Sequence, residues 1–241
     1  MIERVYAVGD IHGQLEKLHE VHDAIASDAG AVSYVIVHIG DYTDRGPDSR
    51  GVIAYLLDRQ SAGASDINLK GNHDRMFMRF MEEPGGRDKR LKAQFGWLSP
   101  QLGGAETLAS YGVEADDEDP HGAPFHAAMV EAVPQEHLTF LAELNESHEW
   151  LGWFFAHAGV APGVPLYMQD EDDLIWIRDP FLKSKRDHGK TVVHGHTPVR
   201  EVEDHGNRIA IDTGAAYGGP LSCVVLEDDR ARVLNGPVLR G

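Results

Sequence analysis

The chain has 241 residues, 42% of them hydrophobic, which is enough for one sizeable core and favours a single domain over residues 1–241. Its formal charge of −17 argues against docking on a nucleic-acid duplex or an anionic membrane. The one cysteine, Cys223, excludes an internal disulfide and a cysteine-rich zinc site. No apolar run approaches the ~20 residues of a membrane span, and a first strand that begins at Ile2 leaves no room for a signal peptide, so we expect a cytoplasmic protein.

The first predicted strand covers residues 5–8 and is followed by a Gly-Asp-Ile-His-Gly motif at 9–13 and a helix to about Ala29. Asp10 and His12 stand two residues apart at the strand end, and this spacing aims an oxygen and an imidazole at one point. The flanking glycines let the backbone approach closely. A turn with an N-capping aspartate would account for the same residues. Taken alone, this motif leaves both interpretations open.

The second predicted strand, residues 34–39, ends in Gly-Asp-Tyr-Thr-Asp-Arg-Gly at 40–46. Ligands of open α/β sheets gather at the carboxyl ends of strands. Asp41 can bridge two cations through its two oxygens, as in sites that hold ions ~3.5–4 Å apart. The guanidinium of Arg45 suits a bidentate grip on phosphate. A surface ion pair between Asp44 and Arg45 is the alternative for this turn.

The next strand, residues 67–70, ends in Gly-Asn-His-Asp at 71–74. The amide oxygen of Asn72 suits a metal site that is already rich in carboxylate. His73 is a candidate general acid, because Asp44 could hold its tautomer and keep it protonated. We expect Asp74 to be a helix N-cap or a solvated charge. A fourth strand, 191–193, precedes His-Gly-His-Thr-Pro at 194–198 and delivers further imidazoles to the same edge.

These three opening motifs resemble those of the phosphoprotein phosphatase family of calcineurin-like metallophosphoesterases, and residues 154–159 and 194–198 resemble its two remaining motifs. The resemblance spans residues 9 to 198, in the family's order. It implies an α/β fold, a two-sheet αββα sandwich. It also implies two divalent metal ions, the first held by Asp10, His12 and Asp41, and the second by Asp41, Asn72, His157 and His196.

By the same resemblance, His73 and Asp44 form the general-acid pair, and Arg45, Arg178 and Asn72 bind the substrate phosphate. For Arg178, a surface pair with Asp179 is the alternative. Oxygen and nitrogen ligands admit Mn, Fe, Zn, Co or Ni, and the family favours Mn²⁺. Other branches carry a further ligand histidine where this chain has Pro198, so the chain resembles the protein-phosphatase and symmetrical diadenosine-tetraphosphatase branch. We expect His194 to pack against the site without binding metal.

Residues from about 83 to 150 form an insertion, predicted to be a mostly helical cap. It follows a helix whose methionines and phenylalanines, at 76–81, are expected in the core. It includes an acidic loop at 114–119 and resembles the corresponding region of bacterial serine/threonine phosphatases. Downstream, residues 174–177 look like a strand that leads to Arg178. The segments 208–215, 221–226 and 231–234 look like antiparallel strands of a second sheet, with Cys223 buried in one of them.

Together these features predict a dimetal phosphomonoester hydrolase, specifically a serine/threonine protein phosphatase. A metal-bridging water whose pKa falls from 15.7 to about 7 would supply the hydroxide nucleophile, and His73 would protonate the leaving oxygen. The substrate would be a phosphorylated protein or a small phosphoester. The alternative is a symmetrical dinucleoside tetraphosphate hydrolase. A noncatalytic interaction module is disfavoured, because a scaffold would be free to lose the ligands, the acid pair and the arginines that are all present here.

Overall fold

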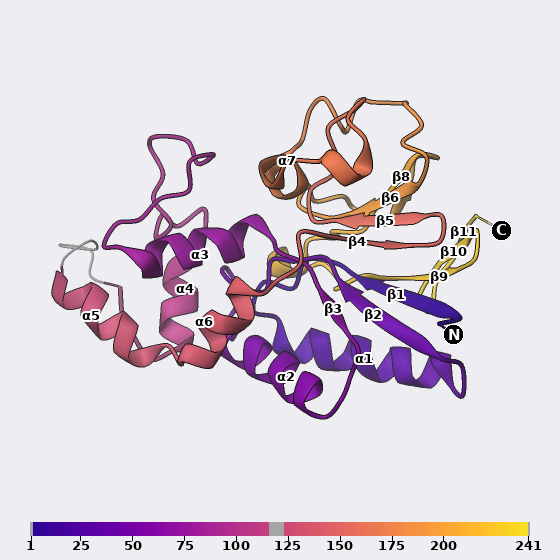
Figure 1. Cartoon of the computed structure of the whole chain (residues 1–241). Coiled ribbons are helices and arrows are strands. Elements are labelled where there is room, and N and C mark those ends of the chain that lie inside the picture. The colour runs from indigo at the N-terminus through magenta and orange to yellow at the C-terminus, as the bar shows by residue number, and fades with distance from the viewer. Residues whose placement is uncertain (1, 116–122, 241) are drawn as a thin grey trace.

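A computed structural model describes residues 2–115 and 123–240 and shows two mixed β-sheets stacked on each other (Figure 1). In the first sheet, β1, β2 and β3 are parallel, and β9 runs antiparallel to β1. Its strand order is β11 (Val238–Arg240), β10 (Arg230–Val233), β9 (Cys223–Glu227), β1 (Arg4–Val8), β2 (Tyr34–His38) and β3 (Ile67–Asn68).

In the second sheet, β5, β6 and β8 are parallel, and β4 and β7 are antiparallel edge strands. Its order is β4 (Ser147–Trp150), β5 (Trp153–Ala156), β6 (Thr191–His194), β8 (Arg208–Ala210) and β7 (Glu203–Asp204). Most residues of β1, β2, β5, β6 and β8 are buried, and β1, β2, β5 and β6 are rich in β-branched or aromatic residues, as expected for sheets covered on both faces.

Side chains along β1 point alternately to the two faces of the first sheet, and their contacts show what covers each face. Val5 and Ala7 point into the core between the two sheets, where Phe155 also lies. Tyr6 and Val8 point to the opposite face and pack with the buried side of α1 (Leu15–Ala29) and α2 (Ser49–Ser61). On α2, the Asp48 side chain accepts the Gly51 N–H at 2.7 Å and so caps the helix.

The outer face of the second sheet is covered by α7 (Glu171–Trp176) and the loop that follows it. Leu174 and Phe181 pack there against Phe154 of β5 and Val192 of β6. Helices therefore lie outside both sheets, which confirms the predicted αββα sandwich. No helix among the described residues is long and apolar enough to cross a membrane.

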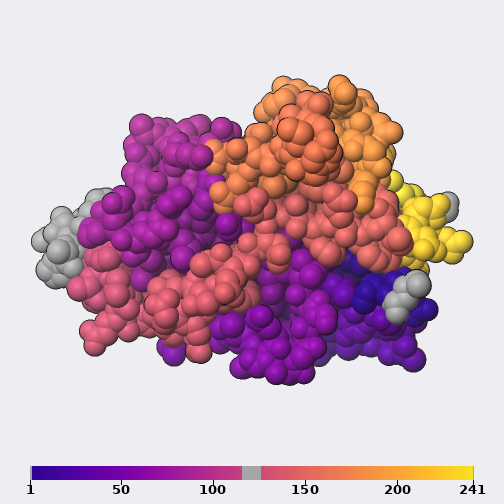
Figure 2. All heavy atoms as spheres, viewed as in Figure 1, coloured from indigo at the N-terminus to yellow at the C-terminus, as the bar shows by residue number. Residues whose placement is uncertain are grey.

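Four helices, α3 (Asn72–Glu82), α4 (Gly104–Ser110), α5 (Ala123–Ala132) and α6 (Gln135–Ala142), gather beside one end of the sandwich (Figure 1). In the space-filling view they form a lobe on the left of the molecule (Figure 2). The apolar side of α3 is buried, with Phe77 stacked on Trp97 at 5.0 Å between ring centroids. Residues 116–119 of the acidic segment lie outside the described residues, and residues 147–150 of the insertion form β4.

Two strand predictions were wrong. Residues 174–176 belong to α7, not to a strand: Asp170 caps this helix by accepting the Asp172 N–H at 2.8 Å, and three acidic residues fill its first turn. An apolar run of four residues cannot distinguish helix from strand by periodicity.

The second error concerns the C-terminal strands. Of the three predicted segments, only the one that forms β8 joins the second sheet, parallel to β6. The other two form β9, which pairs with β1 of the first sheet, and β10, which pairs with β9. Alternation identifies a strand but not its partner, because pairing depends on contacts between residues far apart in the chain. The prediction that Cys223 is buried in a strand is confirmed.

Candidate metal centre

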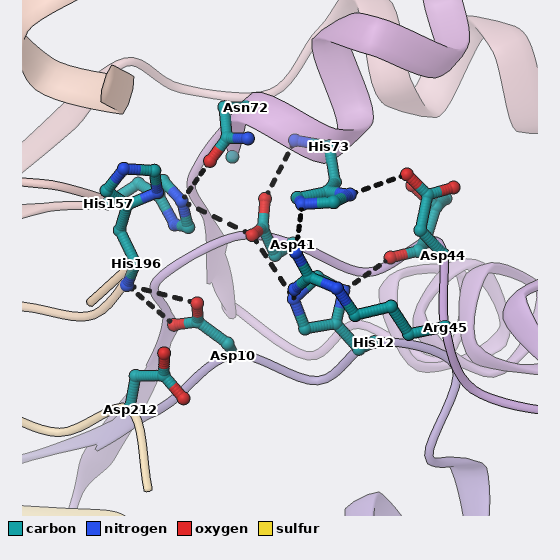
Figure 3. Close-up of polar contacts among 12 residues, drawn as sticks. Asp10, His12, Asp41, Asp44, Arg45, Asn72, His73, His157, His196 and Asp212 are labelled. Atoms are coloured by element: carbon teal, nitrogen blue, oxygen red, sulfur yellow. Dashed lines mark hydrogen bonds and ion pairs between the residues drawn. The ribbon is translucent and has the colours of Figure 1, made fainter. Parts of the chain in front are cut away.

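Ends of strands from both sheets converge on one polar cluster (Figure 3). Every residue that contributes a carboxylate, amide or imidazole group to this cluster is at most 6% exposed. In the first sheet, β1 leads to Asp10 and His12, β2 leads to Asp41, and β3 leads to Asn72. In the second sheet, β5 leads to His157 and β6 leads to His196. Two triads, each with its candidate ligand atoms within 4.8 Å of one another, share Asp41: one adds His12 and His73, and the other adds Asp10 and His157.

Two imidazoles are oriented by backbone carbonyls. His12 Nδ1 lies 2.7 Å from Thr43 O, and His157 Nδ1 lies 2.9 Å from Ile39 O. A carbonyl oxygen only accepts, so in both rings Nδ1 carries the proton and Nε2 offers its lone pair to the cluster. Both Nε2 atoms lie 3.4 Å from Asp41 Oδ2. This carboxylate oxygen therefore sits between two imidazole lone pairs.

His196 supplies the clearest sign that a cation fits the cluster. Its backbone N–H donates to Asp10 Oδ2 at 3.0 Å, whereas its buried Nε2 has no hydrogen-bond partner. His157 Nε2 lies 3.0 Å from Asn72 Oδ1, another oxygen with a free lone pair. A divalent cation would satisfy these nitrogen and oxygen atoms together, since the donor set combines imidazole, carboxylate and amide oxygen.

Buried carboxylates are concentrated at the same place. Burial raises the pKa of Asp41 to about 7 and that of Asp10 well above its ordinary range. Asp212, which follows Ile211 after β8, lies beside Asp10 (Figure 3) and raises its pKa further. Burial also raises the pKa of Asp212. Acidic groups packed this closely call for a compensating cation.

The backbone around the cluster is strained. Five of its residues, none of them glycine, adopt left-handed conformations, with φ of 46° to 75°: His12, Asp41, Asp44, Arg45 and His196. Such conformations cost on the order of 1–3 kcal/mol each and gather at functional sites. Glycine is also required nearby, because a Cβ on Gly71 would lie 2.1 Å from Asp41 Oδ1, and one on Gly195 would lie 1.9 Å from Asp10 Oδ1.

Asp74 holds the Asp41 turn in place. Its Oδ2 accepts the N–H groups of Asp41 and Gly71 at 2.9 Å, and its Oδ1 accepts that of Tyr42 at 2.9 Å. The side chain is buried, so the expectation of a solvated charge was wrong. Capping the start of α3, through Gly71, is only part of its role, because the same carboxylate ties α3 to the loop after β2.

His73 and Asp44 are paired as predicted, with Nδ1 and Oδ2 2.6 Å apart. Asp44 is fully buried and accepts further hydrogen bonds from Trp97 Nε1, at 3.0 and 2.9 Å, and from Thr107 Oγ1, at 2.9 Å. Burial raises the pKa of Asp44 well above its usual range and lowers that of His73 well below it. Because Arg45 Nη2 donates to His73 Nε2, the ring proton lies on Nδ1 and points to Asp44.

The two candidate phosphate-binding arginines lie on different sides of the cluster. Arg45 Nη2 donates to His73 Nε2 at 2.7 Å, and its Nη1 contacts His12 Nε2. Arg178 donates to Thr197 Oγ1 at 3.0 Å and to the His196 carbonyl at 3.4 Å, so it lies on the His196 side. Both guanidiniums lower the pKa of Asp41, opposing the effect of burial.

His194 lies apart from the converging side chains. Its Nδ1 is 3.1 Å from the Gly195 carbonyl, and its Nε2 accepts a hydrogen bond from Arg208 Nη1 at 3.1 Å. Both ring nitrogens are thus engaged by groups outside the cluster. The structure thus places His194 beneath the loop that carries His196.

Three site residues were missed by sequence reasoning. Asp212 had a usable signal, since it ends an apolar run as Asp10 and Asp41 do. Trp97 and Thr107 had none, because they reach Asp44 from the insertion, more than 50 residues away in the chain.

Two stacked sheets whose strand ends assemble buried histidines and aspartates, beside an acid pair and two arginines, define a metal-dependent phosphoesterase. The chain belongs to the calcineurin-like phosphoesterase family, whose sequence profile matches residues 3–226. It is a hydrolase with His/Asp groups typical of the dimetal members of that class.

Several known proteins resemble this one over most of their length. Serine/threonine-protein phosphatase 1 of Salmonella typhimurium is 29% identical over 231 residues, which cover 90% of this chain and 89% of that protein. The symmetrical bis(5'-nucleosyl)-tetraphosphatase of Nitrosospira multiformis is 25% identical over 279 residues, or 93% of each protein. A crystal structure of a protein provisionally named a diadenosine tetraphosphatase covers 97% of this chain and 93% of its own, with a TM-score of 0.67 and 24% identity, which shows the shared fold.

Proposed function

We propose that this phosphoesterase is a serine/threonine protein phosphatase. The observation that carries the proposal is the pair of arginines on either side of the cluster, Arg45 beside His73 and Arg178 beside His196. Two guanidiniums match the charge and oxygen count of a single phosphoryl group. Salmonella phosphatase 1, whose name carries the same activity, supports the choice.

Two nearby cationic side chains, Arg75 and Lys17, are engaged in other contacts, and this also favours a substrate with a single phosphate. Arg75, two residues after His73, binds Asp88 at 2.6 Å and Asp172 at 2.8 Å. Lys17 donates to backbone carbonyls at 2.7 and 2.8 Å. A tetraphosphate chain spreads its charge over four phosphates and would call for more free cations than Arg45 and Arg178.

We propose that one divalent ion is held by Asp10, His12 and Asp41, and a second by Asp41, Asn72, His157 and His196. Mn²⁺ is the ion we expect, while the mixed oxygen and nitrogen donors also admit Fe, Zn, Co or Ni. When bound, such ions supply Lewis-acid charge and lower the pKa of coordinated water. Arg45 must then release His12 Nε2, which the binding of phosphate to its guanidinium would favour.

The protein's own groups would bind the phosphate and protonate the leaving oxygen. Arg45 and Arg178 donate to nonbridging oxygens, with the Asn72 amide beside them. As the phosphate accepts from Arg45, His73 Nε2 is freed, and the dianion opposes the lowering of the pKa of His73 by Arg45. The freed Nε2 would take up a proton from solvent and pass it to the leaving oxygen, while Asp44 holds Nδ1.

The test compares two substrates for the Mn²⁺-loaded protein: a phosphothreonine peptide and diadenosine tetraphosphate, each assayed for kcat/KM. We expect at least a tenfold preference for the peptide. Asp41→Asn removes the shared carboxylate and is expected to lower the rate by about 10³ or more, since metal binding and orientation depend on it. Asp23→Asn, the same change on the exposed side of α1, is the matched control.

Preference for the dinucleotide, with nucleoside diphosphate as product, would instead assign the chain to symmetrical dinucleoside tetraphosphate hydrolysis. The similarity to the symmetrical tetraphosphatase of Nitrosospira multiformis is the observation that supports this second function. Peptide hydrolysis that persists in Asp41→Asn would show that the activity comes from a contaminant and would refute the assignment.

A further inference from the structure

Tyr217 is a large aromatic residue that the proposed mechanism leaves unused. It ends the 3-10 turn η2 (Ala215–Tyr217) and is 65% exposed. The Arg45 guanidinium carbon lies 5.4 Å from its ring centroid, within the range of a cation–π contact. The same guanidinium contacts His73, so Arg45 links the Tyr217 ring to the proposed acid.

The turn that carries Tyr217 is fixed on several sides. The Lys17 ammonium of α1 donates to the carbonyls of Ala215 and Gly219 at 2.7 and 2.8 Å. Gly214 and Gly218 flank the turn in left-handed conformations, and Gly214 N–H donates to Asp212 Oδ1 at 2.9 Å. The ring is therefore presented from a braced loop that begins at the metal centre.

The Tyr217 ring is only partly covered by the protein. Part of it contacts the guanidinium of Arg45, and nearly two thirds of the residue faces solvent at the site of phosphate binding. Aromatic side chains present large, rigid, amphipathic contact area at low entropic cost. A group esterified to a phosphate on Arg45 would extend past this ring.

We propose that Tyr217 is a specificity-determining residue, which binds the apolar side chain next to the phosphorylated residue of a peptide substrate. The proposal rests on the function proposed above and adds a sequence preference to it. A peptide substrate is favoured over a dinucleoside tetraphosphate because the two proposed phosphate-binding arginines, Arg45 and Arg178, match the charge of one phosphate. Tyr217 acts on substrate binding, and the proton transfer stays with His73.

The experiment uses full-length, Mn²⁺-loaded protein and two phosphothreonine peptides that differ only in the residues flanking phosphothreonine, leucine in one and glycine in the other. Tyr217→Ala should raise KM for the leucine peptide about three- to tenfold, as expected for loss of one aromatic contact, with kcat little changed. The glycine peptide should be almost unaffected. Tyr217→Phe keeps the ring and should behave like the unmodified protein.

Two controls separate substrate contact from support of Arg45. Tyr167→Ala removes a tyrosine that is 85% exposed on the 3-10 turn η1 (Leu166–Met168) and should leave both KM values unchanged. Inhibition by inorganic phosphate reports on Arg45 without any organic group. An unchanged inhibition constant in Tyr217→Ala supports the proposal, whereas a rise that parallels KM would show that Tyr217 only positions Arg45.

Equal KM changes for the two peptides, or none, would overturn the proposal while leaving the phosphatase assignment intact. If the unmodified protein hydrolyses neither peptide, the proposed function itself fails. A KM increase in Tyr217→Ala seen only with diadenosine tetraphosphate would make the ring a nucleobase platform and refute the peptide preference.

Discussion

His73 lies between an acidic residue, Asp44, and an arginine, Arg45. Asp44 holds its Nδ1 at 2.6 Å, and Arg45 donates to its Nε2 at 2.7 Å. The first contact fixes the tautomer, and the second occupies the nitrogen that would deliver a proton in the proposed mechanism. Because Arg45 also lowers the pKa of His73, the phosphate contact proposed for Arg45 would couple phosphate binding to the acid strength of His73.

His73→Asn tests this role through the leaving group. An alkyl phosphate, whose alkoxide leaves poorly, should lose about 10²–10⁴ in kcat, the usual contribution of a general acid. A nitrophenyl phosphate, whose phenolate leaves without protonation, should lose less than about tenfold. Initial rates on both substrates measure the difference. Equal losses would mean that His73 serves binding or metal coordination, as its place in one candidate triad allows.

The insertion between α3 and β4 supports the acid pair from outside the sandwich. Trp97 donates to both oxygens of Asp44, and Thr107, on α4, donates to Oδ1. Gly103 O also accepts the Arg45 N–H at 3.0 Å, so the insertion fixes the backbone of the residue proposed to bind phosphate. This segment therefore does more than border the metal centre.

Trp97→Phe keeps most of the aromatic packing against Phe77 but removes the N–H that solvates Asp44. Loss of a hydrogen bond to a buried carboxylate costs on the order of 1.5–3 kcal/mol. We expect urea denaturation to show a loss of that size, and kcat on an alkyl phosphate to fall about tenfold. Trp150→Phe, on the edge strand β4, is the matched control. Unchanged kcat would show that Asp44 needs no support from the insertion.

At the scale of the whole molecule, the two sheets place their strand ends against each other, and the acidic groups of both meet there. Asp10 and Asp41 come from the first sheet and Asp212 from the second. Each has a raised pKa because of burial. Bound cations would therefore stabilise the junction between the sheets as well as the site.

Mn²⁺ should raise the melting temperature. At a concentration of 100 times Kd, one site contributes about 2.7 kcal/mol, which corresponds to roughly 5–10 °C for a chain of this size. The effect should be larger at pH 8 than at pH 5.5, because Asp41, with a pKa of about 7, must lose its proton to bind metal. Thermal melts with Mn²⁺ and with EDTA at both pH values measure it.

The metal-free protein should show the opposite trend with pH. The pKa of Asp41 is higher in the folded chain than its ordinary value of 3.8, so the native state binds more protons between those two values. The contribution of this residue to stability is therefore fully present below pH 3.8 and is lost as the pH rises through about 7. Asp41→Asn should weaken both trends, and Asp23→Asn neither. A Mn²⁺ effect that survives in Asp41→Asn would argue against a shared carboxylate.

The sequence by itself identified most of the residues that gather at the cluster. Asp10, Asp41 and His196 each follow an apolar run, and parallel strands deliver the residues after them to one edge. The motifs after these strands predicted the pairing of His73 with Asp44, and their resemblance to a known family implied the sandwich. Such inferences succeed because short motifs at strand ends are local features, whose geometry depends little on the rest of the chain.

Only the tertiary structure decided the partners of the C-terminal strands, the burial of Asp74, and the approach of Trp97 and Tyr217. β9 pairs with β1 across more than 200 residues, and Tyr217 meets Arg45 from the far end of the chain. Periodicity records which face of an element is buried but not what covers it. Those choices depend on the packing free energy summed over the whole molecule, which no short stretch of sequence contains.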